Sequence, residues 1–262
     1  MEILKIAIAP IGTDGTNDEL IRSICETPAM LELCTPAVYE NEEAALQDLD
    51  QGKVDALVLM PASRRAKSLV DSVEIIIANK TTIMPIEAEP TADDVIRLRD
   101  ILKRDFCLSS PRIAIVQEPI TLSPDFASQV STEHGINTYG PYTTEQLMGE
   151  NTASHFDGII TVGGEAMVQQ IVTGLTQEAP IRFFAGMKSV VTAICQPVCE
   201  NESDEEGLDD VSAYTHPFYT AIDIVRNRAF YDEARQNPLP KLFRDKRDDR
   251  KRDEATQTKA EQ

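Results

Sequence analysis

Residues 52–67, GKVDALVLMPASRRAK, contain a short apolar run followed by a serine and three cations, which are anion-binding residue types. The uninterrupted apolar run, Ala56–Met60, predicts a parallel strand covered on both faces. Open α/β sheets place ligands at the carboxyl ends of such strands, and helix starts favour anions. The side chains expected there, Ser63, Arg64, Arg65 and Lys67, suit a phosphate or carboxylate. A solvated first turn of an ordinary helix is the equal alternative.

Two glycine-containing turns offer weaker versions of the same chemistry. Residues 11–17, IGTDGTN, could cradle a phosphate with backbone N–H groups around Gly15 and the hydroxyls of Thr13 and Thr16. An ordinary strand-to-helix turn is the stronger default, since the dinucleotide-binding glycines and the phosphate-loop lysine are missing. In residues 162–165, VGGE, Gly163 and Gly164 permit close approach of a ligand. Glu165 could act as an acid or base, or complement the helix dipole, which is the safer role.

Histidine and cysteine do not predict a metal centre. His134, His155 and His216 show no ligand spacing and are expected to be surface or capping residues. Of the five cysteines, only Cys195 and Cys199 are close in sequence, and no second metal-binding pair follows them. Reduced thiols are therefore expected. The acidic run at 200–210 lacks the pattern of a calcium loop and predicts a solvated loop.

Composition narrows the classes of partner. The chain has 262 residues and a formal charge of −19, which argues against nucleic acid and anionic membranes because both need a basic face. No apolar run approaches the length of a bilayer span. The opening MEILKIAIAP has the pattern of a first strand rather than of a signal peptide. A cytoplasmic location is the expectation.

Apolar runs alternate with segments of helical periodicity, which predicts an α/β fold with parallel pairing. A final amphipathic helix is expected over Asp223–Arg235, and a disordered charged tail over 244–262. The expected strands are Leu4–Ala9, Ala56–Met60, Val73–Ile77, Arg112–Val116, Gly158–Val162 and Val190–Cys195. The expected helices before the last are Asp18–Glu26, Glu42–Leu49, Ala92–Phe106, Glu145–Glu150 and Glu165–Leu175.

Several segments, in order along the chain, resemble the 4-hydroxythreonine-4-phosphate dehydrogenase family of pyridoxal-phosphate (vitamin B6) biosynthesis. Residues 52–67 are similar to its GxVDAxVTxPxxK segment, and 105–116, DFCLSSPRIAIV, to a segment ending in PrIAV. GINTYGP at 135–141 resembles its Gi...GP turn, and 157–162 the strand entering a metal motif. AIDIVRNRAFYDEARQNPL at 221–239 resembles the closing helix of some members. Gly15 and Glu19 match its N-terminal loop.

This resemblance implies a two-lobed fold of the isocitrate/isopropylmalate-dehydrogenase type, with a mainly parallel sheet and reduced in size. Residues 1–90 and 212–240 would form the first lobe, and 91–211 the second, with the acidic loop at 200–210. The family is a dimeric oxidoreductase that uses NAD and a divalent metal held by histidines from both subunits.

The chain departs from the family at these histidines. Glu118, Pro119 and Ile120 stand where the family has NPHAGE, and residues 163–166, GGEA, stand where it has YHDQ. Aligning the closing helices places residues 199–210 over the third motif, DHGTAxDIAG, again without histidine. A second alignment places Thr220–Ile224 against the TAxDI part of this motif. His216 then lies two residues away from the position of the motif's histidine, and the similarity of the closing helices is lost. Glu118 and Glu165 could in principle form a carboxylate site for magnesium or manganese.

Three functional hypotheses follow. The leading one is a non-catalytic relative of the dehydrogenase, a homodimer that keeps an anion cleft around Ser63, Arg64 and Gly163, binds a phosphorylated metabolite or regulates an active homologue. The alternative is a divergent NAD- and metal-dependent dehydrogenase acting on 4-phosphohydroxy-threonine or a similar phosphorylated hydroxy acid. The third is a dimeric interaction protein without a ligand.

Overall fold

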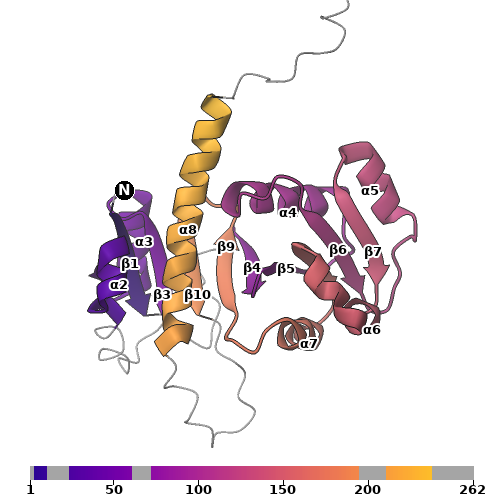
Figure 1. Ribbon diagram of the computed structural model, residues 1–262, viewed down its shortest axis with the longest axis horizontal. Helices are drawn as coiled ribbons and strands as arrows, with labels where there is room; N and C mark the ends of the chain where they lie inside the picture. The colour runs from indigo at the N-terminus through magenta and orange to yellow at the C-terminus, as the bar shows by residue number, and fades with distance from the viewer. Residues whose placement is uncertain (1–2, 11–23, 61–71, 195–210, 238–262) are drawn as a thin grey trace, which may run out of the picture. The chain divides into compact units, whose positions relative to one another are not determined.

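The computed structural model describes residues 3–10, 24–60, 72–194 and 211–237 (Figure 1). The chain divides into two compact units, Met1–Arg228 and Ala229–Gln262. The described ranges exclude Cys195, Cys199, the acidic run at 200–210 and the tail at 244–262, so the expectations for them stay predictions. No helix in the described ranges combines the length and apolarity needed to cross a membrane.

The described strands form one ten-stranded sheet with the order β2-β1-β3-β10-β9-β4-β5-β8-β6-β7. The four strands β2, β1, β3 and β10 are parallel to one another, as are β5, β8, β6 and β7. Their bounds are β1 Leu4–Pro10, β2 Cys34–Val38, β3 Ala56–Met60, β4 Val73–Ala78, β5 Thr81–Ile86, β6 Arg112–Gln117, β7 Asn137–Tyr142, β8 Gly158–Val162, β9 Ile181–Ala185 and β10 Val190–Ile194.

The predicted α/β fold with a mainly parallel sheet is confirmed, but the expectation of parallel pairing is wrong at the centre. There β9 pairs antiparallel with both β10 and β4, and β4 pairs antiparallel with β5. Asn79 and Lys80 connect β4 to β5, and Asn79 has a φ of 56°. Such a two-residue turn with positive φ makes a hairpin, whose strands must be antiparallel.

Helices cover both faces of the sheet, and three clusters of buried side chains define the layers. On one face, strands of both parallel groups share a cluster with α4, α5 and α8. On the other face, α3 packs on β1 and β3, while α6 and α7 pack on β5, β6 and β8. The bounds are α2 Pro28–Leu33, α3 Glu42–Asp50, α4 Ala92–Asp105, α5 Phe126–His134, α6 Thr144–Met148, the 3-10 helix η1 Gly149–His155, α7 Glu165–Leu175 and α8 Val211–Gln236.

Helix α8 begins twelve residues before the predicted Asp223. Pro217 lies inside it and obscures the helical pattern, because proline normally ends a helix. Phe218, Ala221 and Ile222 are nevertheless buried in the core, and the Thr192 hydroxyl of β10 donates a hydrogen bond to the Pro217 carbonyl at 3.0 Å. Packing against the sheet therefore outweighs the local effect of the proline.

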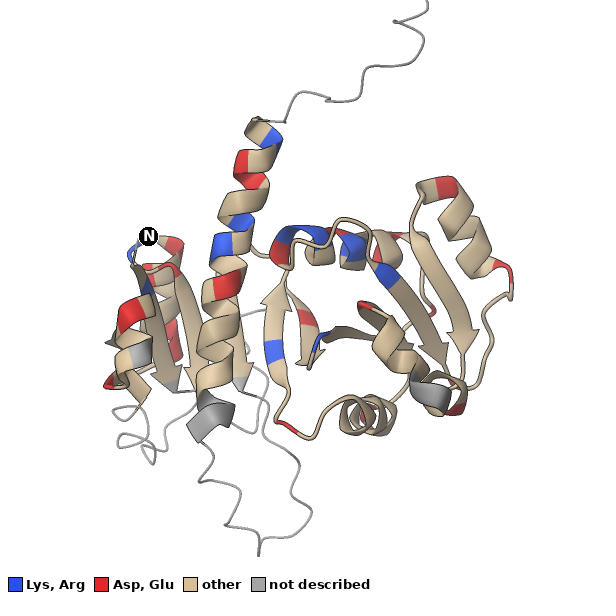
Figure 2. Ribbon diagram, viewed as in Figure 1, with Lys and Arg blue, Asp and Glu red and all other residues tan. Residues whose placement is uncertain are grey.

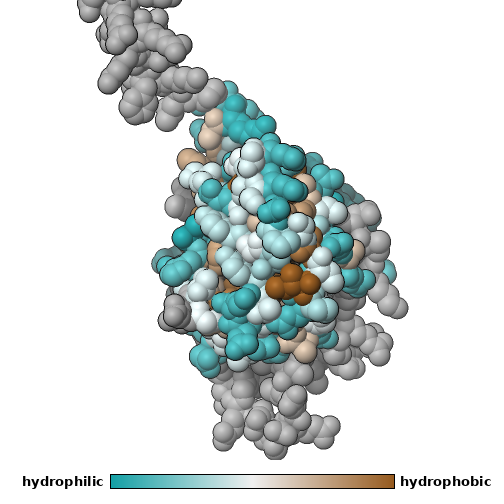
Figure 3. All heavy atoms as spheres, turned by 90° about the vertical axis from the view of Figure 1, so that its right-hand side faces the viewer, coloured by the Kyte–Doolittle hydropathy of each residue, from teal (hydrophilic) through white to brown (hydrophobic). Residues whose placement is uncertain are grey.

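Both edge strands of the sheet carry a proline, Pro36 in β2 and Pro141 in β7. Proline blunts a sheet edge because it removes a backbone donor that another chain could pair with. Figure 3 faces the side on which β7 and α5 lie and shows a mostly hydrophilic surface with a small, strongly hydrophobic spot. This edge is therefore protected against strand addition by its sequence.

Candidate functional site

The carboxyl ends of β5, β8, β6 and β7 form the sheet edge that best fits the predicted ligand site. Val162 of β8 pairs with Gln117 of β6 and Ile86 of β5. Glu118 and Gly163 therefore follow neighbouring positions on adjacent strands. Parallel sheets bind ligands at such edges.

The carboxylate of Glu118 anchors the end of β6 to the start of α6. Its Oε1 accepts a hydrogen bond from the backbone N–H of Thr144 at 2.6 Å. Thr144 is the first residue of α6, where backbone donors lack partners within the helix and negative charge is favourable. Glu118 therefore acts as a structural cap, an interaction that its sequence position did not predict.

Gln117 organises the loop after β6 and was missed at the sequence level. Its side chain is buried, and Oε1 accepts from the backbone N–H groups of Thr121 at 3.0 Å and Leu122 at 2.9 Å. Its Nε2 donates to the Thr121 hydroxyl at 2.9 Å. The sequence did contain a signal for this role, because Gln117 is a polar residue that directly follows the apolar run Ile113–Val116.

The two glycines before α7 have different steric environments. A Cβ on Gly163 would lie 2.5 Å from the terminal methyl of Met167, a flexible side-chain end that can move aside, so packing alone does not require glycine there. A Cβ on Gly164, the N-cap residue, would meet nothing within 4 Å, and no side chain caps the helix. Glu165 is exposed in the first turn, which is compatible with its predicted helix-dipole role.

Two threonine hydroxyls near this edge are buried without a hydrogen-bond partner in the described part of the chain. They belong to Thr161 of β8 and Thr144 of α6. Thr161 lies on the same sheet face as Ile159, which packs with α7. A buried hydroxyl without a partner costs about 1–3 kcal/mol, so these groups would accept a water or ligand atom.

This edge is acidic. The segments that follow the four strands, 87–91, 118–125, 143–146 and 163–166, contain Asp and Glu but no Lys or Arg. Figure 2 shows Lys and Arg instead gathered along α4, which begins after the first of these segments. Binding of an anion at this edge therefore needs cations from another part of the chain.

The predicted cationic groups, Ser63, Arg64, Arg65 and Lys67, lie outside the described residues, as do Thr13, Gly15 and Thr16. Their roles stay predictions. The preceding strand, β3, is separated from β8 by four strands, or about 24 Å at 4.8 Å per strand. Three antiparallel pairings lie between them, so β3 and β8 run in opposite directions and their carboxyl ends lie at opposite edges of the sheet. A ligand shared by Arg64 and Gly163 would have to bridge more than the 24 Å between the strands.

The described residues of this edge do not fit a divalent metal. Glu118 is hydrogen-bonded to the backbone of α6, and Glu165 is exposed on α7. Within the described ranges, no three side chains of His, Cys, Asp or Glu come together as a metal site. A divalent ion needs several converging donors, and these two carboxylates supply too few.

Comparisons with known proteins relate the chain to one group. It is 31% identical to the 4-hydroxythreonine-4-phosphate dehydrogenase of Bacteroides thetaiotaomicron over 162 aligned residues, which cover 56% of this chain and 43% of that enzyme. The match thus spans less than half the length of this relative. No family model matches the chain.

Solved structures show the same fold. A protein of Salmonella typhimurium assigned as a 4-hydroxythreonine-4-phosphate dehydrogenase matches with a TM-score of 0.58 and 12% identity, covering 85% of this chain and all of that one. The enzyme from Klebsiella pneumoniae matches with a TM-score of 0.52 and 10% identity, covering 86% of this chain and 98% of that one.

The fold is that of an α/β protein with the architecture of these dehydrogenases. The 31% sequence identity is evidence of relatedness beyond the similarity of fold. Over the aligned residues the chain is similar in sequence to one 4-hydroxythreonine-4-phosphate dehydrogenase, and it shares the fold of the solved structures named above.

Proposed function

We propose that the chain is a non-catalytic relative of 4-hydroxythreonine-4-phosphate dehydrogenase that binds a small phosphorylated metabolite. The observation that carries the proposal is the 2.6 Å hydrogen bond between Glu118 and the Thr144 N–H. Glu118 occupies the region of a metal-binding motif in the resembled family, and here its carboxylate caps a helix. The sequence has no histidine at that position or at residues 163–166.

The absence of these ligands matters because the reaction named for the family needs a Lewis acid. Oxidation of a secondary alcohol followed by decarboxylation requires a group that holds the hydroxyl oxygen and stabilises the developing enolate. The described residues supply backbone N–H groups and isolated carboxylates at this edge. Such groups can orient a ligand but cannot replace a divalent ion.

A phosphorylated ligand is the favoured class because three features can receive phosphate oxygens. Gly163 and Gly164 lead into α7, whose N-terminus has no side-chain cap. The buried Thr161 hydroxyl has no partner among the described residues. The predicted cations Arg64, Arg65 and Lys67 follow β3, which ends at the opposite edge, so their segment would have to reach across the sheet to supply the positive charge that the acidic edge lacks.

We also propose an oligomeric state and a cellular location. A homodimer in the cytoplasm, alone or paired with an active homologue, is the form in which a non-catalytic relative would bind its ligand and regulate. The divergent dehydrogenase is the second candidate function, favoured by the 31% identity to a named enzyme. An interaction protein without a ligand is the third.

Catalysis is tested by following NADH formation with 4-phosphohydroxy-threonine in the presence of Mg²⁺, Mn²⁺ or Zn²⁺. We expect no NADH above the rate without protein. A rate that is lost in Glu165→Gln but kept in Glu145→Gln, a first-turn acid of α6, would establish the divergent dehydrogenase instead.

Ligand binding is tested separately by thermal unfolding with inorganic phosphate and with 4-phosphohydroxy-threonine. We expect a saturable rise in Tm that is lost in Arg64→Ala and kept in Arg99→Ala, whose side chain pairs with Asp100 at the surface. If neither compound changes Tm, the phosphate-binding role is wrong and the interaction protein becomes the better hypothesis.

A further inference from the structure

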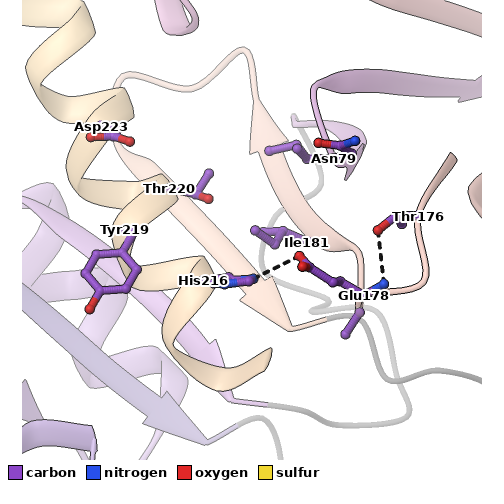
Figure 4. Close-up of a pocket in the computed structure, with 10 residues that line it drawn as sticks. Asn79, Thr176, Glu178, Ile181, His216, Tyr219, Thr220 and Asp223 are labelled. Carbon is purple, nitrogen blue, oxygen red and sulfur yellow. Dashed lines mark hydrogen bonds and ion pairs between the residues drawn. The ribbon is translucent and has the colours of Figure 1, made fainter. Parts of the chain in front are cut away.

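A second polar pocket lies at the other end of β5 from the carboxyl edge (Figure 4). It is lined by the β4–β5 turn, by the segment between α7 and β9, and by α8. Strand β5 is six residues long, which places the pocket about 20 Å from the carboxyl edge at 3.3 Å per residue. The pocket is open to solvent and has a volume of about 210 Å³.

The fold brings these lining residues together from distant parts of the sequence. His216, Tyr219, Thr220 and Asp223 follow the i, i+3, i+4, i+7 spacing of one helix face, so α8 presents them as a stripe. Ile77 and Ile181, paired residues of β4 and β9, supply an apolar wall. Asn79 adds an amide from the hairpin turn.

Two carboxylates and an imidazole dominate the electrostatics of the pocket. His216 Nδ1 lies 3.6 Å from Glu178 Oε2, and Figure 4 shows the two side chains pointing toward each other. The Glu178 backbone N–H donates to the Thr176 hydroxyl at 3.0 Å, which helps to fix this segment. Asp223 has no hydrogen bond or ion pair with any described residue and lines the same pocket.

The arrangement favours an organic cation over a metal ion. No three acidic, histidine or cysteine side chains of the described ranges converge as metal ligands, so Glu178, His216 and Asp223 do not form a chelate. Carboxylates at separate points around a small cavity with an apolar wall instead suit a molecule that carries N–H donors on a short carbon chain. The formal charge of −19 adds long-range attraction for such a cation.

We propose that this pocket binds a small aliphatic amine. An ammonium group donates to Glu178 or Asp223, and the methylene groups lie against Ile77 and Ile181. Thr220 and Asn79 offer further hydrogen bonds. The pocket uses none of the residues proposed for phosphate binding, and its proposed ligand carries the opposite charge.

The test follows the imidazole signals of the three histidines by NMR during titration of the full chain with 1,4-diaminobutane. We expect saturable shifts of the His216 signals, with His134 and His155 unchanged as internal references, since both lie outside the pocket. 1,4-Butanediol, which has the same chain without charge, and NaCl at matched ionic strength should not reproduce the shifts.

Variants then identify the groups that bind the amine. Glu178 and Asp223 are exposed, so Glu178→Gln and Asp223→Asn should each weaken binding by up to about fivefold, the loss expected for an ion pair at the surface, while Glu145→Gln leaves it unchanged. Three results would overturn the proposal: no saturable shift of His216, an equal shift with the diol or with NaCl, or unchanged affinity in both pocket variants.

Discussion

At the scale of single residues, Asp105 is a buried carboxylate that two arginine side chains contact. It is 1% exposed, and Arg228 approaches both its oxygens, with Nε–Oδ1 2.7 Å and Nη2–Oδ2 3.3 Å. Arg104 Nε contacts Oδ1 at 3.0 Å, and Arg228 Nη1 also donates to the Lys188 carbonyl at 2.8 Å. The cluster thus connects the end of α4, the β9–β10 turn and α8.

Removing one partner of such a pair leaves a buried charge short of compensation. Replacing Arg228 by methionine, which keeps much of the side-chain length, should lower the free energy of unfolding by about 3 kcal/mol. Urea denaturation measures the loss. Arg99→Met removes a surface pair and should cost at most about 1 kcal/mol. Equal losses in the two variants would contradict a structural role for the buried cluster.

The thiol of Cys34 gives the protein a pH dependence in the alkaline range. Burial is the main cause that raises its pKa from an ordinary 9.0 to about 11, with a smaller contribution from Cys25, opposed by Arg226. Below pH 9 the thiol is protonated in both folded and unfolded chains. Between pH 9 and 11 only the unfolded chain ionises, so stability should fall as pH rises through this range.

Urea midpoints measured at pH 8, 9, 10 and 11 check this prediction against Cys34→Ala. The variant lacks the titrating group, so its stability should fall less steeply between pH 9 and 11 than that of the parent. Parallel pH curves for the two proteins would show that Cys34 makes no contribution.

At the scale of elements, the success of sequence prediction depends on burial and on neighbours. The expected Ala56–Met60 and Gly158–Val162 are β3 and β8 as predicted, because continuous apolar runs identify strands buried on both faces. Four strands were missed. The strands β2, β5 and β7 each contain a proline, which is normally evidence against a strand, whereas β9 was missed although it contains none. Proline is accommodated in β2 and β7 because both lie at a sheet edge.

Strand β5 accommodates Pro85 differently, since it is an inner strand. Pairing with β4 covers Thr81 to Ile83, and Pro85 lies beyond it. The missing N–H therefore interrupts no contact recorded between β4 and β5. A single sequence does not show where two neighbouring strands separate, so this position could not be predicted.

Strand β7 bends where it passes β6, and Gly140 makes the bend sterically feasible. The pairing register shifts between Ala114 and Val116 of β6. Gly140 has a φ of 105°, and a Cβ there would lie 2.6 Å from the Ile115 carbonyl oxygen. Both the backbone conformation and the space exclude a side chain.

Gly140→Ala should therefore lower the free energy of unfolding by about 2 kcal/mol or more, from backbone strain and the clash with Ile115. Thermal and urea unfolding measure the loss. The matched variant is Gly149→Ala, where φ is −62° and nothing lies within 4 Å of the added carbon. If alanine were tolerated equally at both positions, the steric account of the bend would be wrong.

At the scale of the whole molecule, sequence reasoning located a turn within one strand–turn–helix segment better than contacts between separate segments. The Gly163–Glu165 turn was expected after β8 and lies there, since strand, glycines and helix are contiguous. The Glu118–Thr144 contact joins residues 26 positions apart, and the pocket of Asn79, Glu178 and His216 joins three separate segments. Such groupings depend on strand order, which periodicity does not reveal.

The last prediction also follows from the strand order. It concerns how cooperatively the unit Met1–Arg228 unfolds. One buried cluster contains Ile6 and Val58 from the first parallel group and Ile113 and Ile160 from the second. Residues 1–90 with 212–240 and 91–211 were expected to form separate lobes. A core shared by both groups should make them unfold together.

The Ile6 side chain has no solvent exposure. Ile6→Ala should therefore lower the free energy of unfolding by about 3 kcal/mol, through lost contacts and the cavity left behind. Hydrogen exchange read by mass spectrometry should then show reduced protection in peptides of β1 and β3 and, by a similar amount, in those of β6 and β8. Leu31→Ala, at a side chain 51% exposed, serves as the control and should change neither set. Loss confined to β1 and β3 would mean that the lobes unfold independently, because the shared cluster would then fail to couple the two parallel groups.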